Sequence, residues 1–394
     1  MAKKILLLGE FYRPLIPWFL HDAPPKGVPA VYNLYQFLGN HPEYQFHSII
    51  YNPEVNKIKT FPNGSVIELK KFSFPNYYVW KLLVFIKLLF YSNQVIKNKP
   101  YDLVYGLSTF SIIAGFIGKW NNVPSAGRIY GTILTKPLKE RNYFKIYTRL
   151  LFDVIAIKFP ADKVICTLDG TEYDKAFHFF NKKKEQQPTL IYNGMDAALR
   201  TKLLNFPIVK HYSSPARFCY IARLESYKRQ ELAIDIIHEL IHKYDWKDLE
   251  FTIMGAGSRS EIIRDYVKEK QLTDTIKFIS EIPHQEIPDF MATQDAGFFF
   301  YEGGSLGNTL WESALGGRLI VAVDNAGTGA LFKDGINSVI APDSSDFVEV
   351  MAKKIADLRG ADISNLSQKS RDLVESLVPT WEERFEREFD MLFD

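Results

Sequence analysis

The chain has 394 residues, of which 46% are hydrophobic and 24% are charged, a composition typical of a folded globular protein. Because a single core rarely grows beyond roughly 250–300 residues, this length predicts two domains. The net charge is +2, but the two halves of the chain have net charges of opposite sign. Residues 1–200 hold 26 Lys and Arg against 14 Asp and Glu, a balance of +12, whereas residues 201–394 hold 22 against 32, a balance of −10. We therefore expect different partners for the two halves.

Three features argue against a secreted or membrane-spanning protein. Both cysteines, Cys166 and Cys219, lie in apolar runs, which predicts buried thiols in a reducing compartment rather than a disulfide. The start, MAKKILLLGE, has too short an apolar run for a signal peptide and is expected to form a first strand. The most apolar stretch, residues 77–91, is too short to span a bilayer and carries two lysines. We therefore expect a cytoplasmic protein.

Apolar runs of strand length alternate with helix-like stretches along the whole chain, which is typical of parallel sheets covered by helices. In the first half, we expect strands at residues 5–8, 46–51, 102–105, 126–130, 163–167 and 189–192. In the second half, we expect strands at residues 217–222, 251–254, 276–279, 297–300, 319–323 and 338–341. The pattern predicts an α/β protein with two Rossmann-like, doubly wound parallel-sheet domains that face a central cleft.

The domain boundary is expected where the periodicity weakens, between residues 196 and 216, because prolines interrupt regular structure there. We assign residues 1–205 to the first domain and residues 206–379 to the second. Residues 380–394 are expected to form an acidic amphipathic helix that docks back on the basic first domain. Its apolar side would consist of Trp381, Phe385, Phe389 and Leu392.

The stretch from Tyr301 to Gly317, YEGGSLGNTLWESALGG, is the most informative in the chain. A glycine-rich turn follows a buried strand and precedes a helix that is expected to begin at Asn308. Such a turn exposes backbone N–H groups at the positive end of the helix dipole, which favours an anion such as phosphate. Glu312 lies one helical turn further on and would suit ribose hydroxyls. An ordinary strand–turn–helix with an incidental glutamate is the alternative interpretation.

Two further strand ends carry residues suited to the same ligand. The strand at 217–222 delivers Arg223 at its end and Lys228 five residues later, and both side chains bind phosphate well. The strand at 251–254 ends in the turn Gly255-Ala256-Gly257. Because ligands of open α/β sheets bind at the carboxyl ends of the strands, these three strand ends predict one shared site.

Together, residues 218–228, the turn at 255–257 and GNTLWESALGG at 307–317 resemble the retaining nucleotide-sugar glycosyltransferases of family 4, which have the GT-B fold. Residues 191–196, IYNGMD, also match this family, whereas agreement in the first half is weaker. The resemblance implies transfer of a hexosyl group from a nucleotide-diphosphate sugar to an acceptor hydroxyl with retained anomeric configuration. The donor is expected to be linked to UDP or GDP, and no metal or other cofactor is expected.

The resemblance also implies roles for individual residues. Arg223 and Lys228 are expected to be catalytic, because fixed cations neutralise the charge that develops on the diphosphate leaving group. Glu312 is expected to bind ribose. The remaining donor-binding residues implied by the resemblance are Gly257, Ser305, Leu306, Gly307, Asn308 and Thr309, together with Gly27 in the loop PPKGVP at residues 24–29.

The chain departs from the family at two positions. Members usually carry a glutamate eight residues before the position of Glu312, where this chain has Gly304; a bulged loop could bring Glu302 into that place. Many relatives have a histidine near the anomeric carbon, where this chain has Tyr130, so the resemblance implies that Tyr130 is a third catalytic residue. A tyrosine could hydrogen-bond the sugar but is a poor base, and a packed aromatic at the end of a strand is the alternative interpretation.

The first domain is the acceptor side in this family, and Arg128, Arg141 and Lys145 are the expected acceptor-binding residues. Arg128 lies two residues before Tyr130 on the same strand face, while Arg141, Lys145 and Arg149 would form a basic stripe along one helix. We expect a glycan or lipid-linked acceptor, in surface glycan, polysaccharide or glycolipid biosynthesis. The basic and apolar stretches also suggest peripheral contact with the inner face of the cell membrane. A buried helix with solvated charges elsewhere is the alternative.

Other functions are disfavoured by what the sequence lacks. No known nucleic-acid module is present, the first strand is not followed by the dinucleotide-binding glycine pattern, and no cysteines or histidines have metal-ligand spacing. Two alternatives to a transferase remain. One is a non-catalytic GT-B partner subunit, which Gly304 and Tyr130 would permit, and the other is a related GT-B isomerase or phosphorylase.

Overall fold

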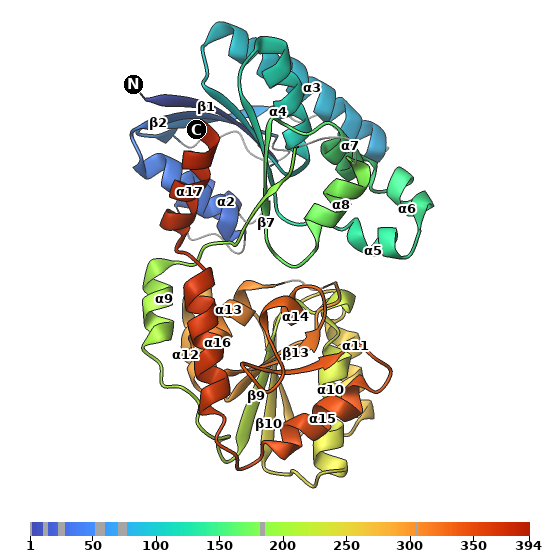
Figure 1. Ribbon diagram of the computed structural model, residues 1–394. Coiled ribbons are helices and arrows are strands. Elements are labelled where there is room, and N and C mark those ends of the chain that lie inside the picture. The colour runs from blue at the N-terminus through green and yellow to red at the C-terminus, as the bar shows by residue number, and fades with distance from the viewer. Residues whose placement is uncertain are drawn as a thin grey trace. The chain divides into compact units, whose positions relative to one another are not determined.

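The computed structural model describes residues 2–10, 15–22, 28–51, 60–69, 77–181, 186–303 and 306–394. The chain divides into two compact units (Figure 1). The first unit comprises Met1–Leu168, Glu172–Gly194 and Trp381–Asp394, and the second comprises Asp169–Thr171 and Met195–Thr380. Each unit is a sheet covered by helices, as the alternating pattern predicted.

The first unit is built on a sheet with the strand order β3-β4-β2-β1-β5-β6-β7-β8. Its pairings are parallel except for the β3–β4 hairpin at one edge. The strands are β1 (Lys3–Glu10), β2 (Tyr44–Tyr51), β3 (Thr60–Phe61), β4 (Gly64–Leu69), β5 (Leu103–Leu107), β6 (Ser125–Ile129), β7 (Lys163–Thr167) and β8 (Thr189–Ile191).

Helices cover both faces of this sheet because the buried strands are apolar on both sides. In β1, Ile5 and Leu7 join the core beneath α2 and α17, whereas Leu6 and Leu8 join the core beneath α3 and α4. The helices are α1 (Ile16–His21), α2 (Pro29–Asn40), α3 (Tyr77–Asn98), α4 (Ser111–Asn121), α5 (Thr135–Lys139), α6 (Tyr143–Thr148), α7 (Leu151–Lys158), α8 (Tyr173–Phe180) and α17 (Trp381–Phe393).

Helix α3 contains the most apolar stretch of the chain. Val84 and Leu88 are buried, whereas Leu82 and Phe90 on other sides of the helix are exposed. Within the described ranges, none of the helices combines the length and apolar character that crossing a bilayer requires.

The second unit has a six-stranded parallel sheet with the order β11-β10-β9-β12-β13-β14. This is the Rossmann order, in which the sheet grows outward in both directions from β9 and β12. The strands are β9 (Ala216–Ile221), β10 (Leu249–Met254), β11 (Ile276–Ile279), β12 (Ala296–Phe299), β13 (Leu319–Asp324) and β14 (Val339–Pro342). The helices are α9 (Ala197–Leu204), α10 (Gln230–His242), α11 (Ser260–Glu269), α12 (Ile287–Ala292), α13 (Asn308–Leu315), α14 (Thr328–Leu331), α15 (Phe347–Asp357) and α16 (Ser364–Leu377).

The structure contains all twelve strands expected from the sequence, within a few residues at their ends. It adds the short strands β3 and β4, which the sequence analysis did not identify. The division between the units also falls earlier than the expected boundary after residue 205. Helix α9 packs against α12 and α13, and Met195 forms a bridge with Thr380, so residues 195–205 belong to the second unit.

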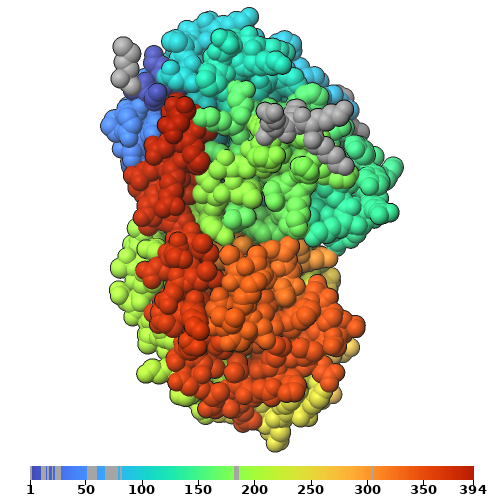
Figure 2. All heavy atoms as spheres, in the orientation of Figure 1, coloured from blue at the N-terminus to red at the C-terminus, as the bar shows by residue number. Residues whose placement is uncertain are grey.

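Helix α17 packs on the rest of the first unit through an aromatic face, and Figure 2 shows this helix at the surface of the molecule. Its outer face is acidic, with exposed Glu382, Glu383, Glu386 and Asp390. The rings of Phe385 and Phe389 lie 5.5 and 5.4 Å from the ring of Phe37 in α2. The sequence pattern predicted this apolar face. It did not predict that two charged residues of α17, Arg384 and Glu388, would be completely buried.

Glu388 is the centre of a buried charge cluster. It accepts hydrogen bonds from the Tyr105 hydroxyl of β5, from the Arg128 guanidinium of β6 and from Arg384. Burial alone would raise the pKa of Glu388, but the two arginines hold it below the ordinary value of 4.5. The side chains of Glu388 and both arginines have no solvent exposure. Removal of the Glu388 charge would therefore leave two buried positive charges without compensation.

We expect Glu388→Gln to destabilise the first unit by about 3–5 kcal/mol, because two buried arginines would lose the carboxylate that pairs with both of them. The measurement is hydrogen exchange of α17 amides as a function of urea concentration, which reports the free energy of opening this helix. Glu386 is exposed on the same helix, and Glu386→Gln should change that free energy by less than about 0.5 kcal/mol. Equal effects of the two substitutions would contradict a structural role for the cluster.

Candidate functional site

The carboxyl ends of β9 and β12 are the natural place for a ligand in the second unit. These two strands are neighbours in the sheet, but the chain leaves them in opposite directions. Such a reversal of strand order opens a crevice at the strand ends. Arg223 follows β9, and the glycine-rich stretch follows β12, so the structure brings together the two motifs that the sequence analysis singled out.

A close approach of two loops determines where Arg223 lies. The Leu224 amide donates to the Ala256 carbonyl at 2.9 Å, so the loops after β9 and β10 run against each other. A Cβ atom on Gly257 would collide with the Leu224 carbonyl, and one on Gly255 would collide with the Ala222 carbonyl. These positions therefore need glycine for close backbone approach. Gly257 donates its own N–H to the Ser260 hydroxyl at 3.2 Å.

The Arg223 side chain is exposed, while a hydrogen bond from a buried side chain holds its backbone in place. The buried Gln230 amide donates to the Arg223 carbonyl at 2.9 Å, and the guanidinium donates to the Tyr227 hydroxyl at 2.6 Å. The Tyr220 hydroxyl donates to the Lys228 carbonyl and accepts from the Phe300 amide at 3.1 Å. The segment from Arg223 to Lys228 is therefore bound to the ends of both β9 and β12.

Lys228 brings a second positive charge to the same place. Its ammonium lies 3.5 Å from the centre of the Tyr301 ring and 5.1 Å from the centre of the Tyr227 ring. Burial, followed by the nearby charge of Arg223, lowers the pKa of Lys228 to about 8. In the described part of the chain, no carboxylate counteracts this shift. Two cations are thus held close together, an arrangement that an anionic ligand would stabilise.

Helix α13 begins at Asn308, as the sequence predicted, and none of the described side chains caps its first turn. The Tyr301 hydroxyl, beneath the ammonium of Lys228, lies 3.3 Å from the Thr309 hydroxyl in that turn. Lys228 therefore lies near the positive end of the α13 dipole. The Leu306 amide donates to the Asp169 carbonyl, so this expected ligand donor is engaged within the protein.

The remaining residues of the glycine-rich loop divide into two groups. Gly304 and Ser305 lie outside the described residues. Glu302 is exposed in the turn after β12, and its amide donates to the Tyr227 carbonyl at 2.8 Å. Gly303 beside it has a φ of +84°, in the left-handed region that favours glycine.

Glu312 is buried beneath a histidine that the sequence analysis missed. The Glu312 side chain is 2% exposed, and its Oε1 atom lies 2.8 Å from Nε2 of His284. The Oε2 atom is buried and has no hydrogen-bond partner among the described residues. The hydrogen bond to Glu312 is the main cause of a raised pKa for His284. His284 follows β11 at the same edge of the sheet, a position that could have marked it in the sequence.

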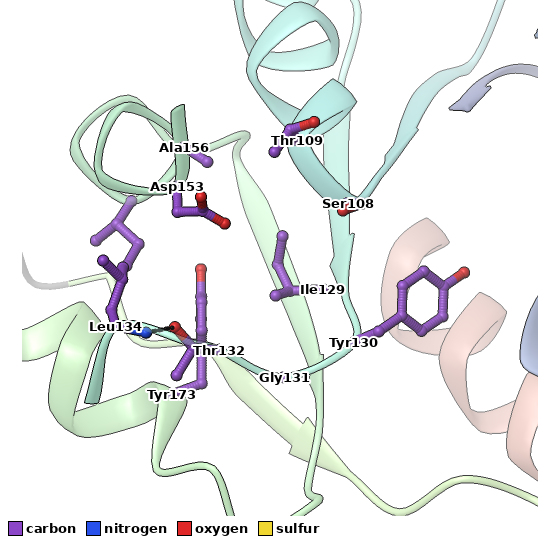
Figure 3. Close-up of a pocket in the computed structure, with 11 residues that line it drawn as sticks. Ser108, Thr109, Ile129, Tyr130, Gly131, Thr132, Leu134, Asp153, Ala156 and Tyr173 are labelled. Carbon is purple, nitrogen blue, oxygen red and sulfur yellow. Dashed lines mark hydrogen bonds between the residues drawn. The ribbon is translucent and has the colours of Figure 1, made fainter. Parts of the chain in front are cut away.

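The expected acceptor residues in the first unit have different surroundings from those the sequence suggested. Arg128 is completely buried in its ion pair with Glu388, so the acceptor contact expected of it is not available. Tyr130 points away from the neighbouring pocket (Figure 3), and its ring lies 5.2 Å from the Arg128 guanidinium. Burial raises the pKa of Tyr130 to about 12, so it is unsuited to act as a base.

The expected basic stripe on one helix is wrong. Arg141 has a φ of +55° and precedes α6, whose first turn is capped by Asn142 through a 3.1 Å hydrogen bond to the Lys145 amide. Helix α6 ends at Thr148, so Arg149 lies beyond it. Arg141, Lys145 and Arg149 therefore belong to a short helix and its flanks. Gly27, Lys182, Lys183 and Lys184 lie outside the described residues.

Most of the second unit matches a model of a known protein family. Residues 215–358 match the family model of glycosyl transferases group 1. This range contains Arg223, Lys228, Gly257, His284 and Glu312. A search of curated proteins gave no match.

Solved structures resemble the whole chain. HepE of Anabaena, solved in complex with UDP, has 14% identity and a TM-score of 0.67, with 98% of this chain and 100% of that chain covered. Sucrose-phosphate synthase of Thermosynechococcus elongatus has 16% identity and a TM-score of 0.68, with 100% and 99% covered. The lipopolysaccharide outer core galactosyltransferase WaaB has 15% identity and a TM-score of 0.67, with 98% and 99% covered. These likenesses establish a GT-B fold with two Rossmann-like domains.

The contact between His284 and Glu312 predicts that the free energy of unfolding of the second unit depends on pH. Because the pKa of His284 is raised in the folded state, the contact stabilises the second unit fully below the ordinary value of 6.5 and loses its contribution as the pH rises through the folded-state pKa. An NMR titration of His284 should give a pKa above 6.5, which Glu312→Gln should lower. Glu286→Gln, in the same turn, should leave it nearly unchanged. A wild-type pKa at or below 6.5 would refute the contact.

Proposed function

We propose that the protein is a glycosyltransferase that moves a sugar from a nucleotide-diphosphate sugar to an acceptor hydroxyl. The observation that carries this proposal is the pair of cations, Arg223 and Lys228, of which Lys228 lies near the start of α13. Fixed N–H dipoles and cations at one point form an anion site. The match of residues 215–358 to glycosyl transferases group 1 and the GT-B fold support it.

In this proposal, Arg223 and Lys228 neutralise the diphosphate leaving group. Breaking the bond between the anomeric carbon and the phosphate oxygen leaves negative charge on the diphosphate, so cations that are already in place lower the barrier. The backbone around both residues is fixed by Gln230 and Tyr220, which means that little reorganisation is needed during the reaction. Removal of one such group typically costs about 3 kcal/mol of barrier, on the order of a hundredfold in rate.

Glu312 is the proposed acceptor of the ribose hydroxyls. Its buried Oε2 atom has no hydrogen-bond partner among the described residues, and a ribose hydroxyl would supply the missing donor. Asn308 and Thr309 at the start of α13, and Gly257 in the adjacent loop, would lie near the donor, with Glu302 the candidate for the transferred sugar. We propose a donor linked to UDP, because HepE, which has the same fold, was solved with UDP and with UDP-glucose.

Through the resemblance to family 4, the proposal also includes retention of anomeric configuration and independence from metal. It further includes a role in surface glycan, polysaccharide or glycolipid synthesis. Two alternatives give different results. A non-catalytic partner subunit would bind UDP without turning over a UDP-sugar. A GT-B isomerase or phosphorylase would turn over a sugar substrate but give a different product.

Lys228→Ala should weaken UDP binding and lower donor turnover about a hundredfold. For the wild type, UDP affinity should fall as the pH rises past about 8, because the Lys228 ammonium loses its proton. Lys228→Arg should abolish this fall, since arginine stays charged. Isothermal titration calorimetry between pH 7 and 9.5 tests both points. Lys247→Ala, at an exposed lysine, is the control and should leave UDP affinity unchanged. An unchanged UDP affinity in Lys228→Ala would refute the role of Lys228 in binding the diphosphate.

We further propose that α6 and its flanks bind an anionic membrane surface from the cytoplasmic side, where a lipid-linked acceptor would lie. Phe144 is 80% exposed, and the neighbouring Tyr143 and Tyr147 are also exposed. A cluster of exposed aromatic side chains is unusual on a surface that contacts only water. Arg141 and Arg149 flank them. Exposed aromatics beside basic groups suit the boundary between headgroups and acyl chains.

Phe144→Ser together with Tyr147→Ser should reduce binding to vesicles that contain anionic lipid by at least about tenfold, because the buried apolar area is lost. Vesicle co-sedimentation is the measurement. Ile262 is 52% exposed in the second unit, and Ile262→Ser should leave vesicle binding unchanged. If the wild type fails to sediment with anionic vesicles, the membrane proposal is wrong.

A further inference from the structure

Two histidines of the second unit have the spacing of metal ligands, which the sequence analysis missed. Residues 238–242 have the sequence HELIH. In an H-E-x-x-H pattern, the two histidines lie on one face of a helix, where both can bind the same zinc ion. The structure provides that helix: α10 runs from Gln230 to His242, so His238 and His242 enclose its last turn.

The two imidazole rings lie next to each other. Their centres are 4.3 Å apart, and their planes are tilted by 42°. With Zn–N bonds of about 2.0–2.1 Å, two imidazoles on one tetrahedral ion would have ring centres about 5 Å apart. Small rotations of the side chains would therefore bring one nitrogen of each ring to a shared ion. His242 is exposed and His238 is partly buried, so an ion can reach the pair from solvent.

The ring nitrogens of this pair are available to an ion. Neither ring forms a hydrogen bond with the described part of the chain. The rings of His41, His211 and His284, by contrast, each have a hydrogen-bond partner there. Coordination by His238 and His242 would therefore break no hydrogen bond among the described residues.

The charges beside the pair favour a cation. Helix α10 contacts α11 and α15 (Figure 1). Asp235 pairs with Lys270 just beyond α11, and Lys243 pairs with Glu349 of α15, each at 2.7 Å. Glu239, between the two histidines, lies 3.9 Å from Lys243. These three carboxylates and two ammonium groups have a net charge of −1. The last turn of α10 also lies at the negative end of the helix dipole, which stabilises a positive charge there.

The pair differs from the centre of a zinc peptidase and lies away from the candidate nucleotide site. Among the described residues, no third histidine, cysteine or carboxylate joins the two histidines, so water would occupy the remaining positions of an ion. Zinc peptidases use three protein ligands. Helix α10 begins two residues after Lys228, and at about 1.5 Å per residue His242 lies roughly 18 Å further along its axis.

We propose that His238 and His242 together bind one divalent transition-metal ion of the class Cu²⁺, Ni²⁺ or Zn²⁺. Imidazole nitrogen suits these ions, whereas Mg²⁺ and Ca²⁺ prefer oxygen ligands. The ion would join the two rings across the last turn of α10 and stabilise that end of the helix. It would take no part in the transfer of a sugar, so this proposal does not rest on the proposed function.

The test is isothermal titration calorimetry of the full chain, without a histidine tag, with ZnCl₂, CuCl₂ and MgCl₂. One Zn²⁺ should bind per chain, Cu²⁺ should bind more tightly, and Mg²⁺ should not bind. His238→Gln and His242→Gln should each weaken Zn²⁺ binding about tenfold or more. The double variant should be little weaker than either single one, because a chelate needs both rings. His178→Gln, at an exposed histidine of α8 with no histidine one turn away, should leave the affinity unchanged.

NMR of the histidine rings locates the bound ion. Of the eight histidines in the chain, His238 and His242 should show the largest changes in chemical shift when Zn²⁺ is added. Amide hydrogen exchange in the presence of EDTA, unchanged from the wild type, would show that the variants are folded. Three outcomes would overturn the proposal: no saturable binding of Zn²⁺ or Cu²⁺, a wild-type Zn²⁺ affinity in both single variants, or shifts confined to other histidines.

Discussion

The close approach between the Leu224 carbonyl and Gly257 is the constraint on which the candidate site of the second unit depends. It lets the loops after β9 and β10 run side by side, which fixes the point where Arg223 leaves the sheet. A side chain at position 257 would push the two loops apart and move the arginine. Catalysis by fixed charges requires that they are in place beforehand, so backbone packing beneath the cations is part of the chemistry that we propose.

The local charge of the candidate site is opposite to the charge of the half in which it lies. Residues 201–394 have a balance of −10, yet Arg223 and Lys228 form a cationic centre there. Net charge over a long segment reports on solubility and long-range attraction. It does not indicate which ligand a particular pocket accepts.

The sequence predicted the strands and the start of α13 because apolar runs and glycine turns are local signals. It also predicted that Arg223 and Glu312 lie in the same unit, because residues at strand ends gather at one edge of the sheet. It could not show that Arg128 and Glu388, 260 residues apart, are paired, since the pairing is a property of tertiary packing. His284 was missed for the same reason: a lone histidine has no pattern until its partner is known.

The pairing of Arg128 with Glu388 also has a consequence for the order of events on the ribosome. The chain leaves the first unit after Gly194 and returns to it at Trp381, so the second unit, apart from Asp169–Thr171, is made in between. At about 5–20 residues per second, Arg128 waits on the order of ten seconds to a minute for its carboxylate. Until then, the nascent first unit lacks α17 and leaves its aromatic face uncovered. The second unit can therefore be complete before the first one closes, the reverse of their order in the chain.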